Sequence, residues 1–311
     1  KLESIPGWRA SLSNDEVLHQ LGEGCGAVIC AAGSGLAPAD KKLYALRDIT
    51  STVDCIPLIA SSIMSKKIAE GTDSLVLDVK VGSGAFMKDI DDARELARTM
   101  VDLGSDAGVR TRALLTDMST PLGLKVGNAL EVAESVEVLA GGGPADVVDL
   151  TVALAREMLE SAGVRDADVE AALADGRAMD TWRAMIREQG GDPDAPLPVS
   201  KHTHTVSAEA DGVLEALDAL AVGVAAWRLG AGRARKEDPV QAVAGVTMHA
   251  KPGDEVRAGQ SLLTLHTATP ERFTRAREAL AGGIVISEAG SPEAADAVAR
   301  RERGVILERI G

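Results

Sequence analysis

Apolar runs of strand length alternate with amphipathic helical patterns through the first half of this chain. The strand-like runs lie at 27–32, 75–81 and 113–116, and the helical patterns lie at 91–103, 129–139 and 147–161. Strands that alternate with helices are typical of βαβ units, in which each helix returns the chain so that successive strands run parallel. The sequence therefore predicts an α/β fold with a mostly parallel sheet.

Two further helices are predicted between the first and second strand-like runs. Pro38 and Pro57 each precede a good helical run, and proline is favoured in the first turn of a helix because its missing N–H needs no partner there. No strand pattern separates these helices, so we expect them to form part of a separate helical lobe. A ligand would then lie in the cleft between the lobes, with hinges at Gly33–Gly35 and Gly71–Asp73.

An arginine, a serine and a lysine on these two helices, Arg47, Ser62 and Lys66, are placed so that all three could face one small polar ligand. Asp40, Tyr44 and Arg47 share one face of the first helix, and Ser62 and Lys66 are neighbours on the second. A guanidinium, a hydroxyl and an ammonium group together suit a planar imide such as uracil or thymine. The alternative is that the charges are solvated and the serine bonds to its own helix. Spacing alone leaves both interpretations open.

Longer stretches of characteristic sequence are distributed over nearly the whole chain, at Lys1–Gly7, Leu36–Asp54, Asp78–Phe86, Leu114–Met118, Gly127–Val132 and Gly230–Asp238. Together they resemble the family of thymidine phosphorylases and pyrimidine-nucleoside phosphorylases. The resemblance implies a two-lobe plan with a mostly parallel α/β lobe, part of a helical lobe and a small C-terminal β-rich α/β unit. The corresponding divisions are 1–35 and 72–195 for the α/β lobe, 36–71 for the helical lobe and 196–311 for the C-terminal unit.

The same resemblance implies roles for individual residues. Arg47 and Lys66 would be catalytic and would hydrogen-bond the carbonyls of the base, while Ser62 would meet the ring N–H and its neighbouring carbonyl. Tyr44 and Phe86 would form walls of the base site. Because the departing base becomes negative, the two cations are expected to strengthen their hold in the transition state.

The implied reaction is reversible phosphorolysis, in which inorganic phosphate and a pyrimidine nucleoside give free base and (deoxy)ribose 1-phosphate. Phosphate is the co-substrate, and no organic cofactor is implied. Relatives carry a phosphate-binding KHSTGG-type segment upstream of the stretch that begins here at Lys1, and it has no match in this sequence. If the chain is complete, we expect it to bind bases without phosphorolysis.

Two other functions remain open. A transferase that joins anthranilate to a phosphoribosyl group shares the implied architecture, but we expect it to lack the trio of Arg47, Ser62 and Lys66. A carrier or assembly module would use the C-terminal unit, where residues 245–266 resemble the barrel-sandwich repeat of biotinyl and lipoyl carriers. Lys251 there precedes Pro-Gly-Asp-Glu, which favours a structural turn over a carrier lysine.

Potassium is a further ion that the resemblance implies. Leu122, Lys125 and Glu134 match the positions at which some relatives hold it through backbone oxygens and a glutamate. A hard cation accepts carbonyl oxygen from any residue type, although the Lys125 ammonium could instead pair with Glu134 and replace the ion. Two weaker candidates are the Gly82–Gly84 turn, as a phosphate contact, and the pair His202 and His204, as metal ligands without an evident third partner.

Composition limits the partners of the chain. The net charge is −14 over 311 residues, which argues against nucleic acid and anionic membranes as partners and leaves a small-molecule substrate. The three cysteines, Cys25, Cys30 and Cys55, lie in apolar company and are predicted to be buried reduced thiols in a cytoplasmic protein. The family resemblance implies a homodimer.

Overall fold

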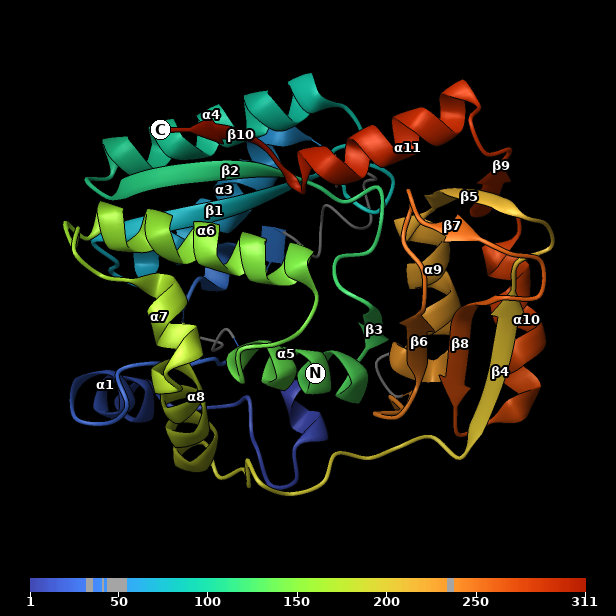
Figure 1. Cartoon of the computed structure of the whole chain (residues 1–311). Coiled ribbons are helices and arrows are strands. Elements are labelled where there is room, and N and C mark those ends of the chain that lie inside the picture. The colour runs from blue at the N-terminus through green and yellow to red at the C-terminus, as the bar shows by residue number, and fades with distance from the viewer. Residues whose placement is uncertain (32–35, 41, 44–54, 234–237) are drawn as a thin grey trace.

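The computed structural model of the chain describes residues 1–31, 36–40, 42–43, 55–233 and 238–311 (Figure 1). Helices α1, α3 and α4 and strands β1, β2 and β3 occupy Asn14–Gly22, Ile56–Ala69, Ile90–Asp106, Ser74–Val81, Arg110–Asp117 and Lys125–Gly127. Helices α5 to α8 occupy Ala129–Leu139, Ala145–Ser161, Val169–Ala174 and Arg177–Glu188. The C-terminal part contains strands β4 to β10, at His202–Ser207, Gly212–Leu217, Gly245–Met248, Glu255–Val256, Ser261–Thr267, Ile284–Ser287 and Ile306–Ile310. Its helices α9, α10 and α11 occupy Ala219–Ala226, Phe273–Leu280 and Pro292–Arg303.

The first sheet has the strand order β1-β2-β10 and is mixed. Strands β1 and β2 are parallel and in register from Ser74 opposite Arg110 to Val81 opposite Asp117, as the alternation of strands and helices predicts. Strand β10 runs antiparallel to β2, because the chain reaches it from the C-terminal part and not through a crossover between parallel neighbours. The α/β class is confirmed, but the third strand is an addition that the sequence pattern did not indicate.

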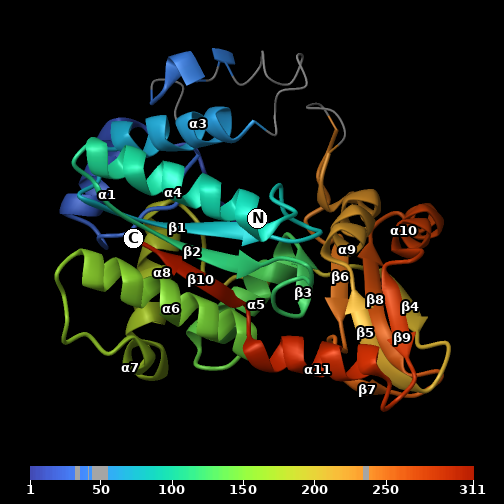
Figure 2. The same ribbon diagram turned by 90° about the horizontal axis from the view of Figure 1, so that it is seen from above.

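Helices cover both faces of this sheet. On one face, alternate β1 residues Leu77, Val79 and Val81 pack against Leu96 and Met100 of α4. Helix α3 adds a further layer outside α4, whereas α6 lies on the opposite face (Figure 2). An ion pair joins α6 to the sheet, with Arg112 Nη1 of β2 at 3.1 Å from Glu157 Oε2.

The strand predicted at 27–32 is wrong for the residues that the structure describes there, 27–31, which belong to no sheet. Buried glutamines hydrogen-bond to two backbone carbonyls of this segment. Gln189 Nε2 donates to the Ile29 carbonyl at 2.8 Å, and Gln20 Nε2 donates to the Ala27 carbonyl at 2.8 Å. Side-chain amides therefore replace the strand neighbour that an apolar extended segment normally requires.

The C-terminal part contains two antiparallel sheets around an apolar core (Figure 1). One has the order β3-β6-β8-β4 and the other β7-β5-β9, with α9 and α10 packed beside them. Strand β3 enters from the region predicted as the α/β lobe, and β10 returns from the region predicted as the C-terminal unit. The predicted boundary between residues 195 and 196 stays a prediction. Two strand pairs, β3 with β6 and β10 with β2, join residues on either side of that boundary.

The predicted burial of the cysteines can be compared with the structure. The cysteines are free thiols, but Cys30 and Cys55 are exposed and Cys25 is only half-buried, so the prediction of buried thiols is wrong. In the described part of the chain, no helix combines the length and apolar character that crossing a membrane requires.

Candidate active site

Helix α3 positions two of the predicted site residues. Pro57 lies in its first turn, and Gly71 follows its last turn with φ +73°, where a side chain would be strained. Ala60 and Met64 are buried between α3 and α4, and Ile59 and Ile63 are partly buried against the same core. Leu58 and Ile68 of the same helix are 38% and 39% exposed, so they contribute less to this core.

Ser62, Lys66 and Asp40 form one hydrogen-bonded cluster. Lys66 Nζ donates to Ser62 Oγ at 3.1 Å and to Asp40 Oδ2 at 2.6 Å. Ser62 is buried, and the side chains of Lys66 and Asp40 are 30% and 15% exposed. The aspartate comes from the segment that begins at Pro38, so the cluster joins two helical segments. A charge-assisted pair of this kind fixes the position of the ammonium.

This arrangement leaves hydrogen-bonding capacity on Ser62. A serine hydroxyl has one hydrogen and two lone pairs, and Lys66 uses one lone pair. The remaining lone pair can accept from an N–H, and the hydrogen can be donated to a carbonyl. That pattern matches one edge of a pyrimidine imide and is the pattern expected for Ser62.

Asp40 is the residue whose role the sequence reasoning missed. The helical spacing places it on the face of Tyr44 and Arg47, but spacing gives it no role of its own in the site. Its position in the structure identifies it as the residue that orients Lys66. Tyr44 and Arg47 themselves lie outside the described residues, so their predicted contacts stay predictions.

Phe86 lies on the Gly82–Phe86 turn, immediately after β1. Its side chain is 70% exposed, which leaves the ring available to a ligand. The next residue, Met87, shares a core with Ala60 and Met64 of α3. The turn and α3 are therefore tied to the same apolar cluster, although no contact between Phe86 and the Ser62 cluster is part of the described geometry.

Three backbone N–H groups of this turn are hydrogen-bonded to carbonyls of the protein itself. The N–H groups of Gly82, Gly84 and Ala85 donate to the carbonyls of Met87, Met118 and Gly82, each at 3.0 Å. An anion-binding turn points such groups at its ligand. The geometry therefore favours a plain tight turn over a phosphate contact.

Glu134 on α5 lies against the loop that contains Leu122 and Lys125. It is buried, and its Oε1 accepts the N–H of Leu124 at 2.8 Å. Burial raises the pKa of Glu134. The Lys125 ammonium pairs with Glu137 at 3.0 Å, so the expected alternative in which it pairs with Glu134 is not the observed arrangement. A buried carboxylate is one of the oxygen donors that suit a hard cation.

The remaining metal candidates are not supported. Within the described ranges, no group of three His, Cys, Asp or Glu side chains is arranged to hold a metal ion. The ring of His204 on β4 instead contacts the ring of Phe273 of α10 at a tilt of 37°, with ring centroids 5.6 Å apart.

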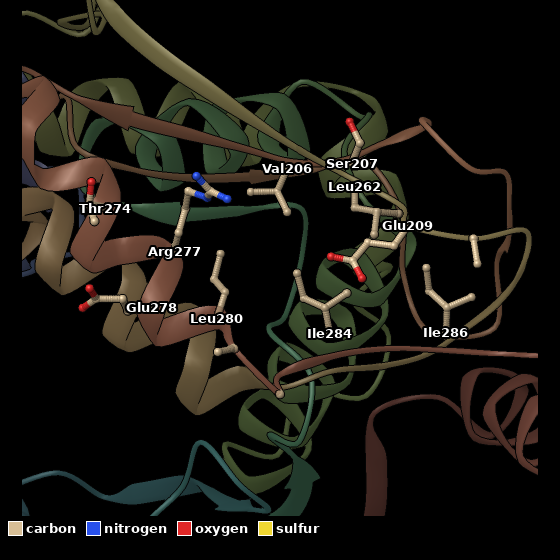
Figure 3. A pocket seen from close by; sticks show the side chains of 13 residues that line it. Val206, Ser207, Glu209, Leu262, Thr274, Arg277, Glu278, Leu280, Ile284 and Ile286 are labelled. Atoms are coloured by element: carbon tan, nitrogen blue, oxygen red, sulfur yellow. The ribbon is translucent and has the colours of Figure 1, made fainter.

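A separate pocket lies in the C-terminal part (Figure 3). It encloses about 700 Å³ between β4, α10 and β9, with Leu280 and Ile284 among its apolar lining. Arg277 and Glu209 lie on different sides of it. None of the lining residues belongs to the Ser62 cluster or to the Gly82–Phe86 turn, so it is not the predicted base site.

Family models match two regions of the chain. The model described as "Glycosyl transferase family, a/b domain" matches residues 1–184, and the model described as "Pyrimidine nucleoside phosphorylase C-terminal domain" matches residues 213–287. The first covers the α3 cluster and the first two strands of the first sheet. The second covers most of the strands of the C-terminal part.

The chain is also similar in sequence to curated proteins. A thymidine phosphorylase of Mycobacterium tuberculosis is 61% identical over 288 residues, which cover 93% of this chain and 67% of that protein. Pyrimidine-nucleoside phosphorylases of Geobacillus stearothermophilus and Bacillus subtilis are each 46% identical, over 86% of this chain and 64% of theirs. The chain thus spans about two thirds of the length of these relatives.

Proposed function

Because the chain belongs to the pyrimidine nucleoside phosphorylase family, we propose that it provides the base-binding part of an enzyme that cleaves pyrimidine nucleosides with phosphate. The substrates would be thymidine, deoxyuridine or uridine, and the products free base and (deoxy)ribose 1-phosphate. The single observation that carries the proposal is the cluster in which Asp40 holds Lys66 beside Ser62.

In the proposed reaction, a phosphate oxygen forms a bond to the anomeric carbon of the sugar while the bond from that carbon to the base nitrogen breaks. The bonding electrons move onto the base, which leaves as an anion and then takes up a proton. Its negative charge spreads over the ring carbonyls. A lysine ammonium fixed beside one carbonyl stabilises this anion more than the neutral nucleoside, which lowers the barrier.

Each residue of the cluster has a distinct role. Lys66 carries the charge, Asp40 keeps it in place and Ser62 orients the ring through its remaining donor and acceptor. The family motif assigns the second cation to Arg47 and the walls to Tyr44 and Phe86. Gly71–Asp73, which joins α3 to β1, is the proposed hinge that lets the base-holding segment close on the phosphate side.

A potassium ion is proposed as a structural ligand. The carbonyls of Leu122 and Lys125 and the carboxylate of Glu134 would hold it. When bound, it would supply positive charge to a buried carboxylate and order the loop. The protein is further proposed to act as a homodimer in the cytoplasm, on small-molecule substrates without nucleic-acid or membrane partners; the net charge of −14 supports the last point.

The test is phosphate-dependent release of thymine from thymidine by the naturally encoded protein. Lys66→Met should lower kcat by about a hundredfold, the usual loss for one donor to a developing anion. The matched control is Lys67→Met on the same helix, because Lys67 pairs only with the exposed Glu70, at 3.0 Å, among the contacts described. Equal activity of the two variants would contradict the proposal. Tight thymine binding without release of base by the wild-type protein would favour a catalytically inactive relative.

A further inference from the structure

Lys251 reaches from the C-terminal part into the loop that precedes β3. Its ammonium donates to the Pro121 carbonyl at 2.6 Å and to Asp146 Oδ2 at 2.8 Å. Both charged side chains are largely buried, with 17% and 26% of their surface exposed. A lysine on a turn that merely reversed the chain would be solvated, because its stem is long and its charge prefers water. This lysine instead spans two parts of the fold.

The backbone of Lys251 is held as well. Its N–H donates to Asp254 Oδ2 at 2.8 Å, and Asp254 also pairs with Arg301 of α11. The turn that carries Lys251 is therefore held in place by α11, through the pair of Asp254 and Arg301. A positioned cation loses less conformational entropy when it binds its partners than a mobile one does.

The loop that Lys251 contacts is held on two other sides. Asp146, at the start of α6, accepts the Gly123 N–H at 3.1 Å, and Glu134 of α5 accepts the Leu124 N–H at 2.8 Å. These carboxylates bind the N–H groups of the loop, whereas Lys251 binds a carbonyl. The Pro121 carbonyl thus accepts its hydrogen bond from Lys251 of the C-terminal part.

Upstream, the same loop supports the turn that carries Phe86. The Met118 carbonyl accepts the Gly84 N–H at 3.0 Å, and the Ser119 carbonyl accepts Ser83 Oγ at 3.2 Å. Gly82 also packs closely here, since a Cβ on it would lie 2.7 Å from Ser119 N. Three residues of the turn therefore rest on Met118 and Ser119, only a few residues before Pro121.

We propose that Lys251 is a positioning residue for the base site, which acts through the 118–121 loop on the turn that carries Phe86. The proposal rests on the proposed function, because it takes Phe86 to be a wall of the base site. It gives the C-terminal part a role in substrate binding through one charged contact. The contact is complete within the described residues and requires no added ion.

The first test compares steady-state kinetics of Lys251→Met, Lys251→Arg and the exposed control Lys201→Met in the naturally encoded protein. Lys251→Met should raise the KM for thymidine about tenfold and change kcat by less than about twofold, because ground-state and transition-state contacts with the wall weaken alike. Lys251→Arg should restore most of the affinity, since arginine can serve both acceptors. A KM equal to that of Lys201→Met would overturn the proposal, and so would equal losses in both Lys251 variants.

A double-mutant cycle identifies the route. Phe86→Ala removes an exposed ring and leaves the core intact. In that background Lys251→Met should cause no further rise in KM, since the two residues act on one contact. A full additional rise would show that Lys251 acts elsewhere and would overturn the proposal. An unchanged KM in Phe86→Ala alone would instead remove Phe86 from the site, which contradicts the proposed wall and is a separate failure.

Discussion

Lys66 Nζ lies 2.6 Å from Asp40 Oδ2 and 3.1 Å from Ser62 Oγ, so one ammonium is shared by a carboxylate and a hydroxyl. The carboxylate keeps the ammonium from rotating to other acceptors. In the proposed reaction the Lys66 ammonium therefore does not need to reorient when the base becomes an anion.

Asp40→Asn tests that relationship. The amide keeps the size of the side chain but removes the charge that orients Lys66, so kcat should fall by about tenfold with a smaller change in KM. The exposed Asp102→Asn on α4 is the control for loss of one negative charge. In a Lys66→Met background Asp40→Asn should have no further effect on kcat, and a full further loss would assign Asp40 an independent role.

Gly82→Ala tests the close contact between the Phe86 turn and its supporting loop. Gly82 has φ +123°, and a Cβ there would lie 2.7 Å from Ser119 N. Gly108 also has positive φ, +79°, but a Cβ there would have no neighbour within 4 Å, which makes Gly108→Ala a control for a positive φ without a close contact. Urea denaturation should give a loss of about 1–3 kcal/mol for strain at Gly108 and a larger loss at Gly82. Equal losses of unfolding free energy in the two variants would mean that the loop at Ser119 moves to accommodate the added methyl group.

His266→Gln tests a pH dependence of stability. Burial, and then the nearby charge of His249, lower the pKa of His266, whose Nε2 lies 3.0 Å from Thr247 Oγ1. The unfolded chain then binds a proton that the folded chain resists, so stability falls as pH drops through the ordinary histidine pKa of 6.5 towards the lowered folded value. Unfolding free energies measured at about pH 7.5 and about pH 5.5 should differ less in His266→Gln than in wild type. The exposed His202→Gln should keep the wild-type difference, and an unchanged difference in His266→Gln would exclude this cause.

The long periodic elements could be predicted from sequence. The helix predicted at 129–139 coincides with α5, and the strands predicted at 75–81 and 113–116 lie within β1 and β2. The strand predicted at 27–32 failed because Gln189 and Gln20, one of them far away in sequence, take the hydrogen bonds of that segment. Likewise β10 pairs with β2, from which it is separated by almost two hundred residues of sequence. Local hydrophobic periodicity does not indicate which distant strands will pair.

The site was predictable where one helix sets the geometry. Residues four apart on a helix are neighbours, and the structure brings Ser62 and Lys66 within hydrogen-bond distance. The partnership of Lys66 with Asp40 was missed because it joins two helical segments. The sequence allows Lys125 to pair with Glu134. In the structure Lys125 pairs with Glu137, which lies one helical turn further along α5. Sequence spacing alone cannot distinguish these two partners.

In the proposed reaction, Lys66 stabilises negative charge on the departing base. The kcat values of wild type and Lys66→Met on deoxyuridine and 5-fluorodeoxyuridine test this role, because fluorine makes the base a better leaving group. Lys66→Met should lower kcat by about a hundredfold on deoxyuridine and by several-fold less on the fluorinated substrate, whose anion needs less stabilisation. The same loss on both substrates would mean that Lys66 only binds the nucleoside and does not stabilise the anion.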